Sequence, residues 1–224
     1  MTTASPAPRH RARPSSAADL LLRVAERERE NLSRTLDALS ASGTLELAAQ
    51  RVTAARRRFV LGSDKSAAYA ALLATDLSAG MSNVTLIEAG TARSLDVLCD
   101  VRAGDVLVAF SLRRYARRTL TFAETFKREG GMVIGITDDP GTRLAALSDV
   151  VVVVGTSSVS HADSPTAVAA TVHILATLAT ASAKGARRRL DKRADLARTL
   201  DTYEMNTAAG SPDTLPTTLR RDKK

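Results

Sequence analysis

The sequence of 224 residues contains no tryptophan, and aromatic residues make up only 3% of it. Its core must therefore be built from Val, Leu, Ile and Ala, which suit parallel strands buried between helices. A single cysteine, Cys99, excludes an intramolecular disulfide framework and indicates a reducing compartment. No apolar run approaches the roughly 20 residues that a membrane helix needs. These absences predict a cytoplasmic protein with no membrane association.

The two ends of the chain have few large apolar residues. Arg9, Arg11 and Arg13 have no apolar segment behind them, so we expect no secretory signal. We predict a disordered basic tail over residues 1–16, which hold three prolines, and a second disordered tail over residues 208–224. Positive charge, in contrast, is abundant: the formal net charge is +8 and the pI is near 10.2. Such a charge is compatible with nucleic acid or other polyanions, but it does not fix a function.

Residues 17–56 have the pattern of a helical extension. An apolar stripe recurs at three- and four-residue steps, and Glu28 interrupts it. Ser42-Gly43 should end a first helix, and Thr44 is the predicted N-cap of a second. We expect the extension to pack on the outside of its own domain or on a partner subunit, as a dimerisation linker. The stripe consists of Leu21, Val24, Leu32, Leu36 and Leu39.

Five apolar runs alternate with helical segments between residues 57 and 183, which we assign to one domain. This alternation predicts an α/β fold of three layers, doubly wound, around a five-stranded parallel sheet. After it, residues 184–207 should form a basic helical segment, since seven Lys or Arg residues stand against two Asp within 184–198. The expected strands are 58–62, 83–88, 105–110, 132–136 and 149–154.

The loop after the first expected strand is one candidate binding segment. Gly62 lets the backbone turn closely, and Ser63 and Ser66 place hydroxyls at the start of a helix, where free N–H groups favour anions. The alternative is that Ser66 only caps the helix. The segment is not a dinucleotide-binding or P-loop motif, because Asp64 stands where another glycine would be needed.

The loop after the third expected strand is the second candidate. Ser111 is followed by four arginines within six positions, Arg113, Arg114, Arg117 and Arg118. Cations at a helix N-terminus oppose the helix dipole unless an anion compensates, so we predict that at least one of these arginines binds an anion. The alternative is a solvated helix start. Ligands of open α/β sheets bind outside the carboxyl ends of the strands, where both loops should lie.

A third polar loop precedes the last long helix of the domain. It ends in Asp163-Ser164-Pro165, with Ser164 as the predicted N-cap and Pro165 as the first helical residue. His161 and His173 have no metal-ligand spacing, so we expect neither a metal nor a cofactor. Gly-x-Ser-x-Gly does not occur, and no pair of carboxylates identifies a general base, so the catalytic residues are unknown. Residues 138–141 are read as a turn.

Several segments together carry a family resemblance. They are Phe59-Val-Leu-Gly62 with Ser66, Gly104-Asp105-Val-Leu-Val-Ala-Phe-Ser111, Gly131-Met-Val-Ile-Gly-Ile-Thr137-Asp138, Leu147-Ser-Asp149 and Asp163-Ser164. On these residues, the chain from about residue 31 to residue 183 resembles the sugar isomerase (SIS) domain of MurR/RpiR-type transcription regulators. The helix-turn-helix domain with which that family normally begins has no counterpart, and Asp64 replaces the second glycine of the first loop. In the Ser-x-Ser-Gly-x-Thr phosphate loop, Ser111 keeps the first serine, Arg113 stands at the second and Ala116 at the threonine.

The resemblance implies a SIS fold (flavodoxin-like, Rossmann-like) that forms a homodimer and binds a phosphorylated sugar or a related anion. It implies a phosphosugar sensor in the transcriptional regulation of carbohydrate metabolism. Two alternatives stay open: a sugar-phosphate aldose–ketose isomerase, and a degenerate SIS scaffold that only dimerises. DNA would be involved only if a separate reader or the basic tails contribute. The predicted ligand-binding residues are Gly62, Ser63, Ser66, Ser111, Arg113, Arg114, Asp163 and Ser164.

Overall fold

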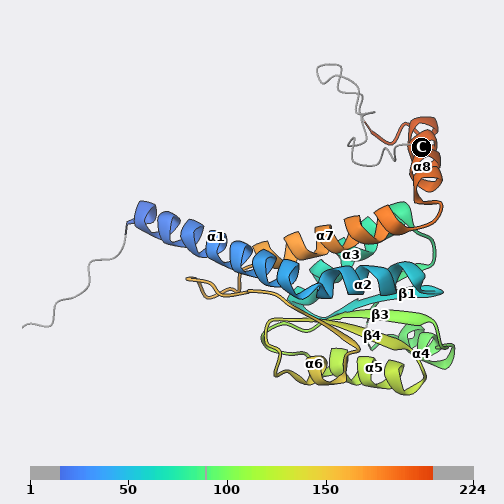
Figure 1. Cartoon of the computed structure of the whole chain (residues 1–224), viewed down its shortest axis with the longest axis horizontal. Coiled ribbons are helices and arrows are strands. Elements are labelled where there is room, and N and C mark those ends of the chain that lie inside the picture. The colour runs from blue at the N-terminus through green and yellow to red at the C-terminus, as the bar shows by residue number, and fades with distance from the viewer. Residues whose placement is uncertain (1–15, 89, 204–224) are drawn as a thin grey trace, which may run out of the picture.

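The sheet at the centre of the molecule has five parallel strands in the order β2-β1-β3-β4-β5 (Figure 1). The computed structural model describes residues 16–88 and 90–203, so the predicted tails, apart from Ser16, lie outside the described residues. The prediction of an α/β fold around a five-stranded parallel sheet is confirmed. The strands are β1 (Arg57–Gly62), β2 (Val84–Ile87), β3 (Asp105–Phe110), β4 (Met132–Thr137) and β5 (Val150–Val153).

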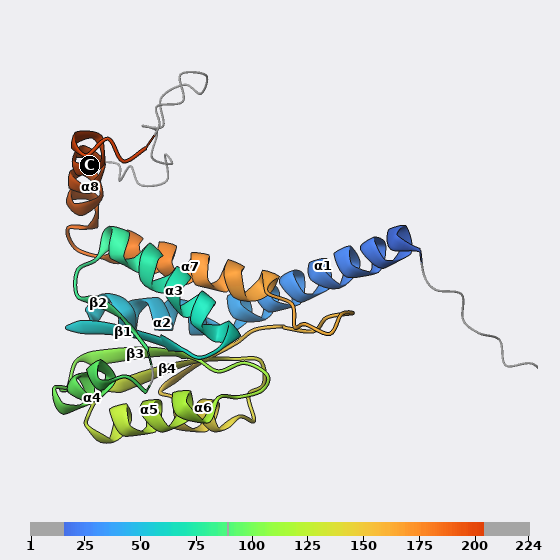
Figure 2. The ribbon, with the colours of Figure 1, turned by 180° about the vertical axis from the view of Figure 1, so that it is seen from behind.

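Helices cover both faces of the sheet and make three layers, as Figures 1 and 2 show from opposite sides. One face packs against α2 (Thr44–Ala54), α3 (Lys65–Gly80) and α7 (Thr166–Ser182), and the other against α4 (Ala92–Cys99), α5 (Arg117–Arg128) and α6 (Arg143–Leu147). Alternate residues of a strand point to opposite faces. Val60 therefore lies in the first core, and its neighbours Phe59 and Leu61 lie in the second. This double burial explains the valine-rich, continuously apolar strands.

Helix α1 (Ala17–Ser42) packs on the body of the protein with only its second half. A capping box between Ser16 and Asp19 starts it, and its first half projects past the sheet (Figures 1 and 2). Its buried residues are Asn31, Thr35 and Leu39, while Leu21 is 67% exposed. The second half therefore packs on its own domain, whereas for the first half contact with a partner subunit stays a prediction.

The junction of α1 and α2 also differs from the prediction. Gly43 adopts φ 64°, ends α1 and serves as the N-cap residue of α2, so Thr44 is the first helical residue and not the cap. Glycine is the residue that enters this left-handed conformation without steric cost. Beyond Gly43, α2 continues in the same general direction as α1 and leads to the start of β1 (Figure 1).

Helix α8 (Ala186–Thr199) stands away from the three layers (Figure 1). It follows α7 after a bend of 108°, with Gly185 at φ 83° between them. Only its first residue, Ala186, is buried. Among the described residues, no single helix is long and apolar enough to span a membrane; α7 and α8 satisfy length and composition only when they are taken together.

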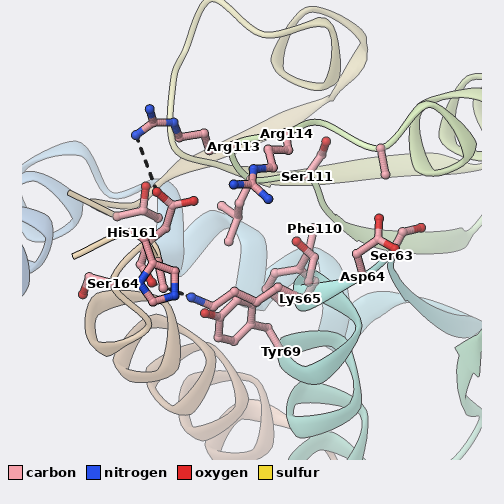
Figure 3. A pocket seen from close by; sticks show the side chains of 16 residues that line it. Ser63, Asp64, Lys65, Tyr69, Phe110, Ser111, Arg113, Arg114, His161 and Ser164 are labelled. Carbon is pink, nitrogen blue, oxygen red and sulfur yellow. Dashed lines mark hydrogen bonds and ion pairs between the residues drawn. The ribbon is translucent and has the colours of Figure 1, made fainter. Parts of the chain in front are cut away.

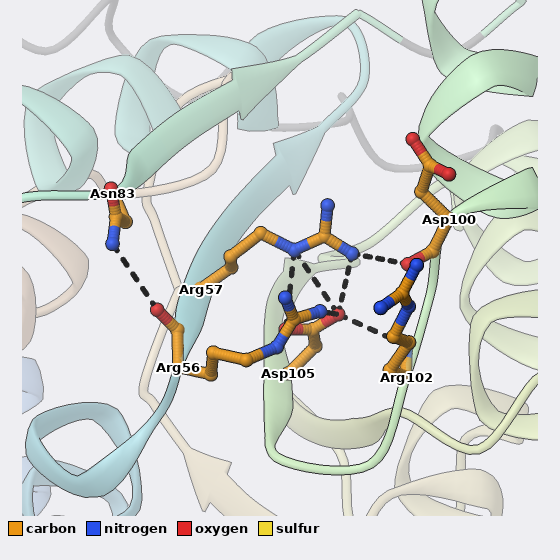
Figure 4. A network of polar contacts seen from close by, with 6 residues as sticks. All are labelled: Arg56, Arg57, Asn83, Asp100, Arg102 and Asp105. Carbon is orange, nitrogen blue, oxygen red and sulfur yellow. Dashed lines mark hydrogen bonds and ion pairs between the residues drawn. The ribbon is translucent and has the colours of Figure 1, made fainter.

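A buried carboxylate joins two strands at the end of the sheet opposite to their carboxyl ends (Figure 4). Asp105, at the start of β3, is fully buried and accepts hydrogen bonds from Arg56 at 2.9 Å, from Arg57 at 2.7 Å and from the Arg102 N–H at 3.0 Å. Burial alone would raise the pKa of Asp105, but the hydrogen bonds from Arg57, Arg102 and Arg56 prevail and lower this pKa. The hydrogen bond with Asp105 in turn raises the pKa of Arg57. The network fixes the start of β1 beside the start of β3.

Candidate functional site

A pocket of about 420 Å³ opens at the carboxyl ends of β1 and β3 (Figure 3). These strands are neighbours in the sheet, but the helices that follow them, α3 and α5, cover opposite faces. The two loops therefore diverge and leave a crevice, which is the usual ligand site of an open α/β sheet. A third loop, between β5 and α7, completes the wall.

The structure brings the predicted binding residues together at this pocket, with one exception. Gly62 lies behind the wall, where a Cβ atom would stand 2.2 Å from the carbonyl oxygen of Ser66. Gly62 is thus needed for the close approach of α3 to the end of β1. The predicted residues that line the pocket are Ser63, Ser66, Ser111, Arg113, Arg114, Asp163 and Ser164.

The first loop is fastened to the start of α5. Helix α3 begins at Lys65, so Ser66 lies within its first turn and is not the N-cap. The Ser63 hydroxyl shares a buried hydrogen bond of 2.8 Å with the Thr119 hydroxyl. Thr119 is fully buried by this contact and does not line the pocket, whereas Ala116 does. The loop after β3 thus offers no threonine hydroxyl to the pocket.

Two pocket residues hold a backbone conformation that glycine favours. Asp64 has φ 54°, and Arg114 has φ 71°. Both stand where the SIS-like pattern has glycine, the residue that adopts a positive φ without steric cost. Such a conformation is sparsely populated by residues with a Cβ atom.

The acidic side chain in the first loop has a partner on helix α5. Asp64 accepts a hydrogen bond of 2.6 Å from Arg118, and both side chains are more than half exposed. An exposed pair of this kind adds little stability. It does, however, balance the negative charge that would otherwise repel an anion at the rim of the pocket.

The hydroxyl of Ser111 is the least satisfied polar group at the site. Ser111 is 2% exposed, and its Oγ atom has no hydrogen-bond partner among the described residues. The Ser111 N–H donates to the Ile136 carbonyl at 3.0 Å, which fixes the end of β3 and leaves the hydroxyl at the pocket. Beside it, Arg114 forms neither an ion pair nor a hydrogen bond within residues 16–88 and 90–203. A buried donor without a partner is costly, so the pocket is suited to a ligand that accepts hydrogen bonds here.

Asp163 links the third loop to the other two. Its carboxylate pairs with Arg113 at 3.6 Å, and its backbone carbonyl accepts a hydrogen bond from the Lys65 ammonium. Burial, and secondly the charge of Asp163, raise the pKa of Tyr69 on α3. Lys65 and Arg113 therefore place two cations on the pocket wall, each held by a partner from another loop.

Ser164 is not the N-cap of α7 as predicted. The helix begins at Thr166 with Pro165 at the N-cap position, and the Thr166 N–H reaches the Ser164 hydroxyl at only 3.4 Å. The Ser164 hydroxyl donates instead to the carboxylate of Glu28 on α1. Ser164 thus bonds to an acceptor that is distant in the sequence instead of capping α7.

Sequence reasoning missed several residues of the pocket wall. Tyr69 stands three residues after Ser66 on α3, a spacing that places both on one helix face. His161 was read as a lone histidine, and its place in a hydroxyl-rich loop was the available indication. In the described part of the chain, no three side chains of His, Cys, Asp or Glu gather in a way that could hold a metal ion. The missed residues are Asp64, Lys65, Tyr69, Thr156 and His161.

The carboxylates after β4 lie outside this wall. Residues 138–141 form a turn as predicted, with the Gly141 N–H donating to the Asp139 carboxylate at 2.7 Å. Asp138 contacts the Thr156 hydroxyl at 3.4 Å, and its other carboxylate oxygen is buried without a hydrogen-bond partner among the described residues. Neither residue lines the pocket.

The family model described as "SIS domain" matches residues 52–184 of this chain. Among solved structures, the sugar isomerase domain of the RpiR transcription factor from Sphaerobacter thermophilus is similar, with a TM-score of 0.70 and 26% identity over 82% of this chain and 99% of that one. The Vibrio vulnificus NanR protein complexed with ManNAc-6P gives a TM-score of 0.70 and 17% identity, covering 82% of this chain and 70% of that one. An E. coli CFT073 protein in complex with the sugar phosphate A-5-P gives a TM-score of 0.60 and 20% identity, covering 81% of this chain and 95% of that one. No curated protein sequence matches this chain.

Proposed function

Because this chain belongs to the SIS domain family, we propose that its pocket binds a phosphorylated sugar or a related anion. We infer further that it acts as a sensor of the MurR/RpiR type in the transcriptional regulation of carbohydrate metabolism. The similarity to the RpiR sugar isomerase domain supports the regulatory role. The ManNAc-6P and A-5-P complexes of the two other neighbours support the class of ligand.

The buried, unpartnered hydroxyl of Ser111 is the observation that carries this proposal. A phosphate oxygen accepts hydrogen bonds and would satisfy this hydroxyl, and it would also meet the free guanidinium of Arg114. Lys65 and Arg113 add positive charge to the same wall. Cations and hydroxyl donors from separate loops are an arrangement that suits an anion.

The ion pairing of the acidic side chains at the pocket favours a sensor over an isomerase. Moving a proton between adjacent carbons requires a base in reach of the substrate. Asp163 is paired with Arg113, and Asp64 is paired with Arg118. Among the described Asp, Glu and His side chains that line the pocket, His161 is the one outside these ion pairs, so the isomerase alternative rests on that residue.

Ser111→Ala should remove most of the thermal stabilisation that a ligand gives. At about 100 times Kd, a bound ligand adds about 2.7 kcal/mol, which for a domain of this size raises Tm by roughly 5–10 °C. The measurement is a thermal-shift series of wild type and Ser111→Ala with ManNAc-6P, A-5-P and inorganic phosphate. Ser40→Ala, a change of an exposed serine on α1, is the matched control and should behave as wild type.

Two other outcomes would redirect the proposal. If no compound shifts the Tm of wild type, the chain is a degenerate scaffold. If a compound that binds is also converted to its ketose or aldose isomer, the protein is an isomerase and His161→Ala becomes the next variant.

We also propose that the protein is a homodimer in which the projecting half of α1 contacts the partner. This half exposes Leu20, Leu21 and Leu22 at 44%, 67% and 68%, an apolar patch that a partner would cover. We expect twice the monomer mass in light scattering at micromolar concentration, and a shift towards monomer in a Leu21→Glu, Leu22→Glu double variant. A monomeric wild type would contradict the homodimer.

The proposed setting is the cytoplasm, where a phosphorylated metabolite would be sensed. We expect DNA binding only if a separate DNA-binding domain or the basic segments of this chain contribute. Of these, α8 exposes Arg187, Arg188, Lys192 and Arg193, and the terminal tails lie outside the described residues.

A further inference from the structure

Three polar residues on one face of α1 hold the loop that forms one wall of the pocket. Glu28 accepts from the Ser164 hydroxyl, the Asn31 amide donates to the Ser157 carbonyl, and Thr35 accepts from the Gly155 N–H at 2.9 Å. Asn31 and Thr35 are 7% and 4% exposed. A helix face that buries polar groups in this way is positioning the loop, because apolar residues would serve packing alone.

The contact with Glu28 decides which way the Ser164 hydroxyl points its proton. A serine hydroxyl has one proton to donate, and an ionised carboxylate can only accept. The Ser164 proton is therefore committed to Glu28, and the lone pairs of Ser164 remain to accept. One of them meets the Thr166 N–H at a long 3.4 Å, which leaves the other for the pocket that Ser164 lines.

From this geometry we propose that Glu28 is a specificity-determining positioning residue that makes Ser164 a hydrogen-bond acceptor towards the ligand. The inference rests on the proposed function of the pocket. It adds which wall of the pocket donates hydrogen bonds to the ligand and which wall accepts them. The wall with Ser111 and Arg114 presents donors and takes the anion. The wall with Ser164 presents an acceptor; the carboxylate of Asp163 lies on this wall and that of Glu28 lies behind it.

This polarity selects a chemical class of ligand. An anionic oxygen at the Ser164 hydroxyl would meet an acceptor with the carboxylate of Glu28 behind it, whereas a ligand hydroxyl can donate to Ser164. The expected ligand is therefore a phosphate monoester that carries a free hydroxyl at the end remote from the phosphate.

Calorimetric titration with two probes tests the assignment. Inorganic phosphate reports only the Ser111 wall, while A-5-P or ManNAc-6P, whichever binds wild type, reports both walls. Glu28→Leu, which removes the acceptor, and Ser164→Ala should each weaken the sugar phosphate about three- to tenfold, the effect of one hydrogen bond, and leave phosphate affinity within about twofold. Glu26→Leu, which removes an exposed carboxylate on the same helix, should change neither affinity.

The double variant separates positioning from a general structural effect. If Glu28 acts through Ser164, Glu28→Leu adds nothing to the loss caused by Ser164→Ala, so the two losses are not additive. Additive losses, an equal loss of phosphate affinity, or no loss in Glu28→Leu would each overturn the assignment. Should Ser164→Ala fail to fold, Glu28→Leu still decides by its contrast between the probes. If wild type binds neither probe, the proposed function itself fails and the inference with it.

Discussion

Asp105→Asn is expected to lower the free energy of unfolding by about 3 kcal/mol, the cost of leaving a buried ion-pair partner without its charge. Asp105 is fully buried, and Arg56 and Arg57 both direct guanidinium groups at its carboxylate. A neutral amide fills the same space but cannot compensate two cations. The start of β1 would lose its main link to the start of β3.

Chemical denaturation at pH 7 measures this loss, and a Tm about 6–12 °C below that of wild type should accompany it. Asp195→Ala, which breaks an exposed pair with Arg198 on α8, is the control and should change stability by less than about 1 kcal/mol. An Asp105→Asn variant as stable as wild type would show that the two arginines are solvated well enough without the carboxylate.

The same network predicts how the difference in unfolding free energy between wild type and Asp105→Asn depends on pH. Because the folded state lowers the pKa of Asp105, ionised Asp105 stabilises the fold fully above its unfolded pKa of about 4, and this stabilisation is lost as the pH falls through the lower folded pKa. The variant has no such titration. The stability difference should therefore be largest near pH 7 and should shrink below about pH 4.

Gly62→Ala is expected to destabilise the protein by about 3 kcal/mol and to abolish ligand binding with it. The added Cβ atom would lie 2.2 Å from the carbonyl oxygen and 2.5 Å from the carbonyl carbon of Ser66. These are backbone atoms, so no change of rotamer relieves the clash. The first turn of α3 must move, and Ser63 and Ser66 move with it.

A comparison of Tm and of ligand-induced thermal shift for two glycine variants checks this expectation. In Gly141→Ala, the new Cβ atom would meet only the exposed Asp139 carboxylate at 3.2 Å, which can swing aside. This variant should retain both the stability and the ligand response of wild type. If Gly62→Ala retained them as well, α3 would have to be free to shift at its N-terminus.

The sheet could be predicted from the sequence because its signal is local. Five short apolar runs between helical segments can be buried on both sides only in a parallel sheet, and the predicted strand bounds agree with the observed ones to within one residue at each end. The gathering of the three loops followed from topology, since parallel strands end at one edge. These conclusions need no knowledge of which side chains meet.

The predictions that failed concern residues whose hydrogen bonds are set by a partner far away in the sequence. Ser164 and Pro165 read locally as a cap and a first helical residue, but Glu28, 136 residues away, accepts the Ser164 hydroxyl. The charge that interrupts the apolar stripe of α1 was the only indication of this contact. The buried face of α1 likewise contains Asn31 and Thr35, whose partners are backbone groups that a sequence pattern does not display.

The positive φ angles of Asp64 and Arg114 bear on how relatives of this protein are recognised. A search pattern that demands glycine in both of these pocket loops tests for a residue type, whereas a positive φ is a property of the backbone. Chains that reach this shape with an acid or an arginine fall outside such a pattern although their backbone follows the same path. For such chains, comparison of backbone dihedral angles is a better criterion of kinship than comparison of residue letters.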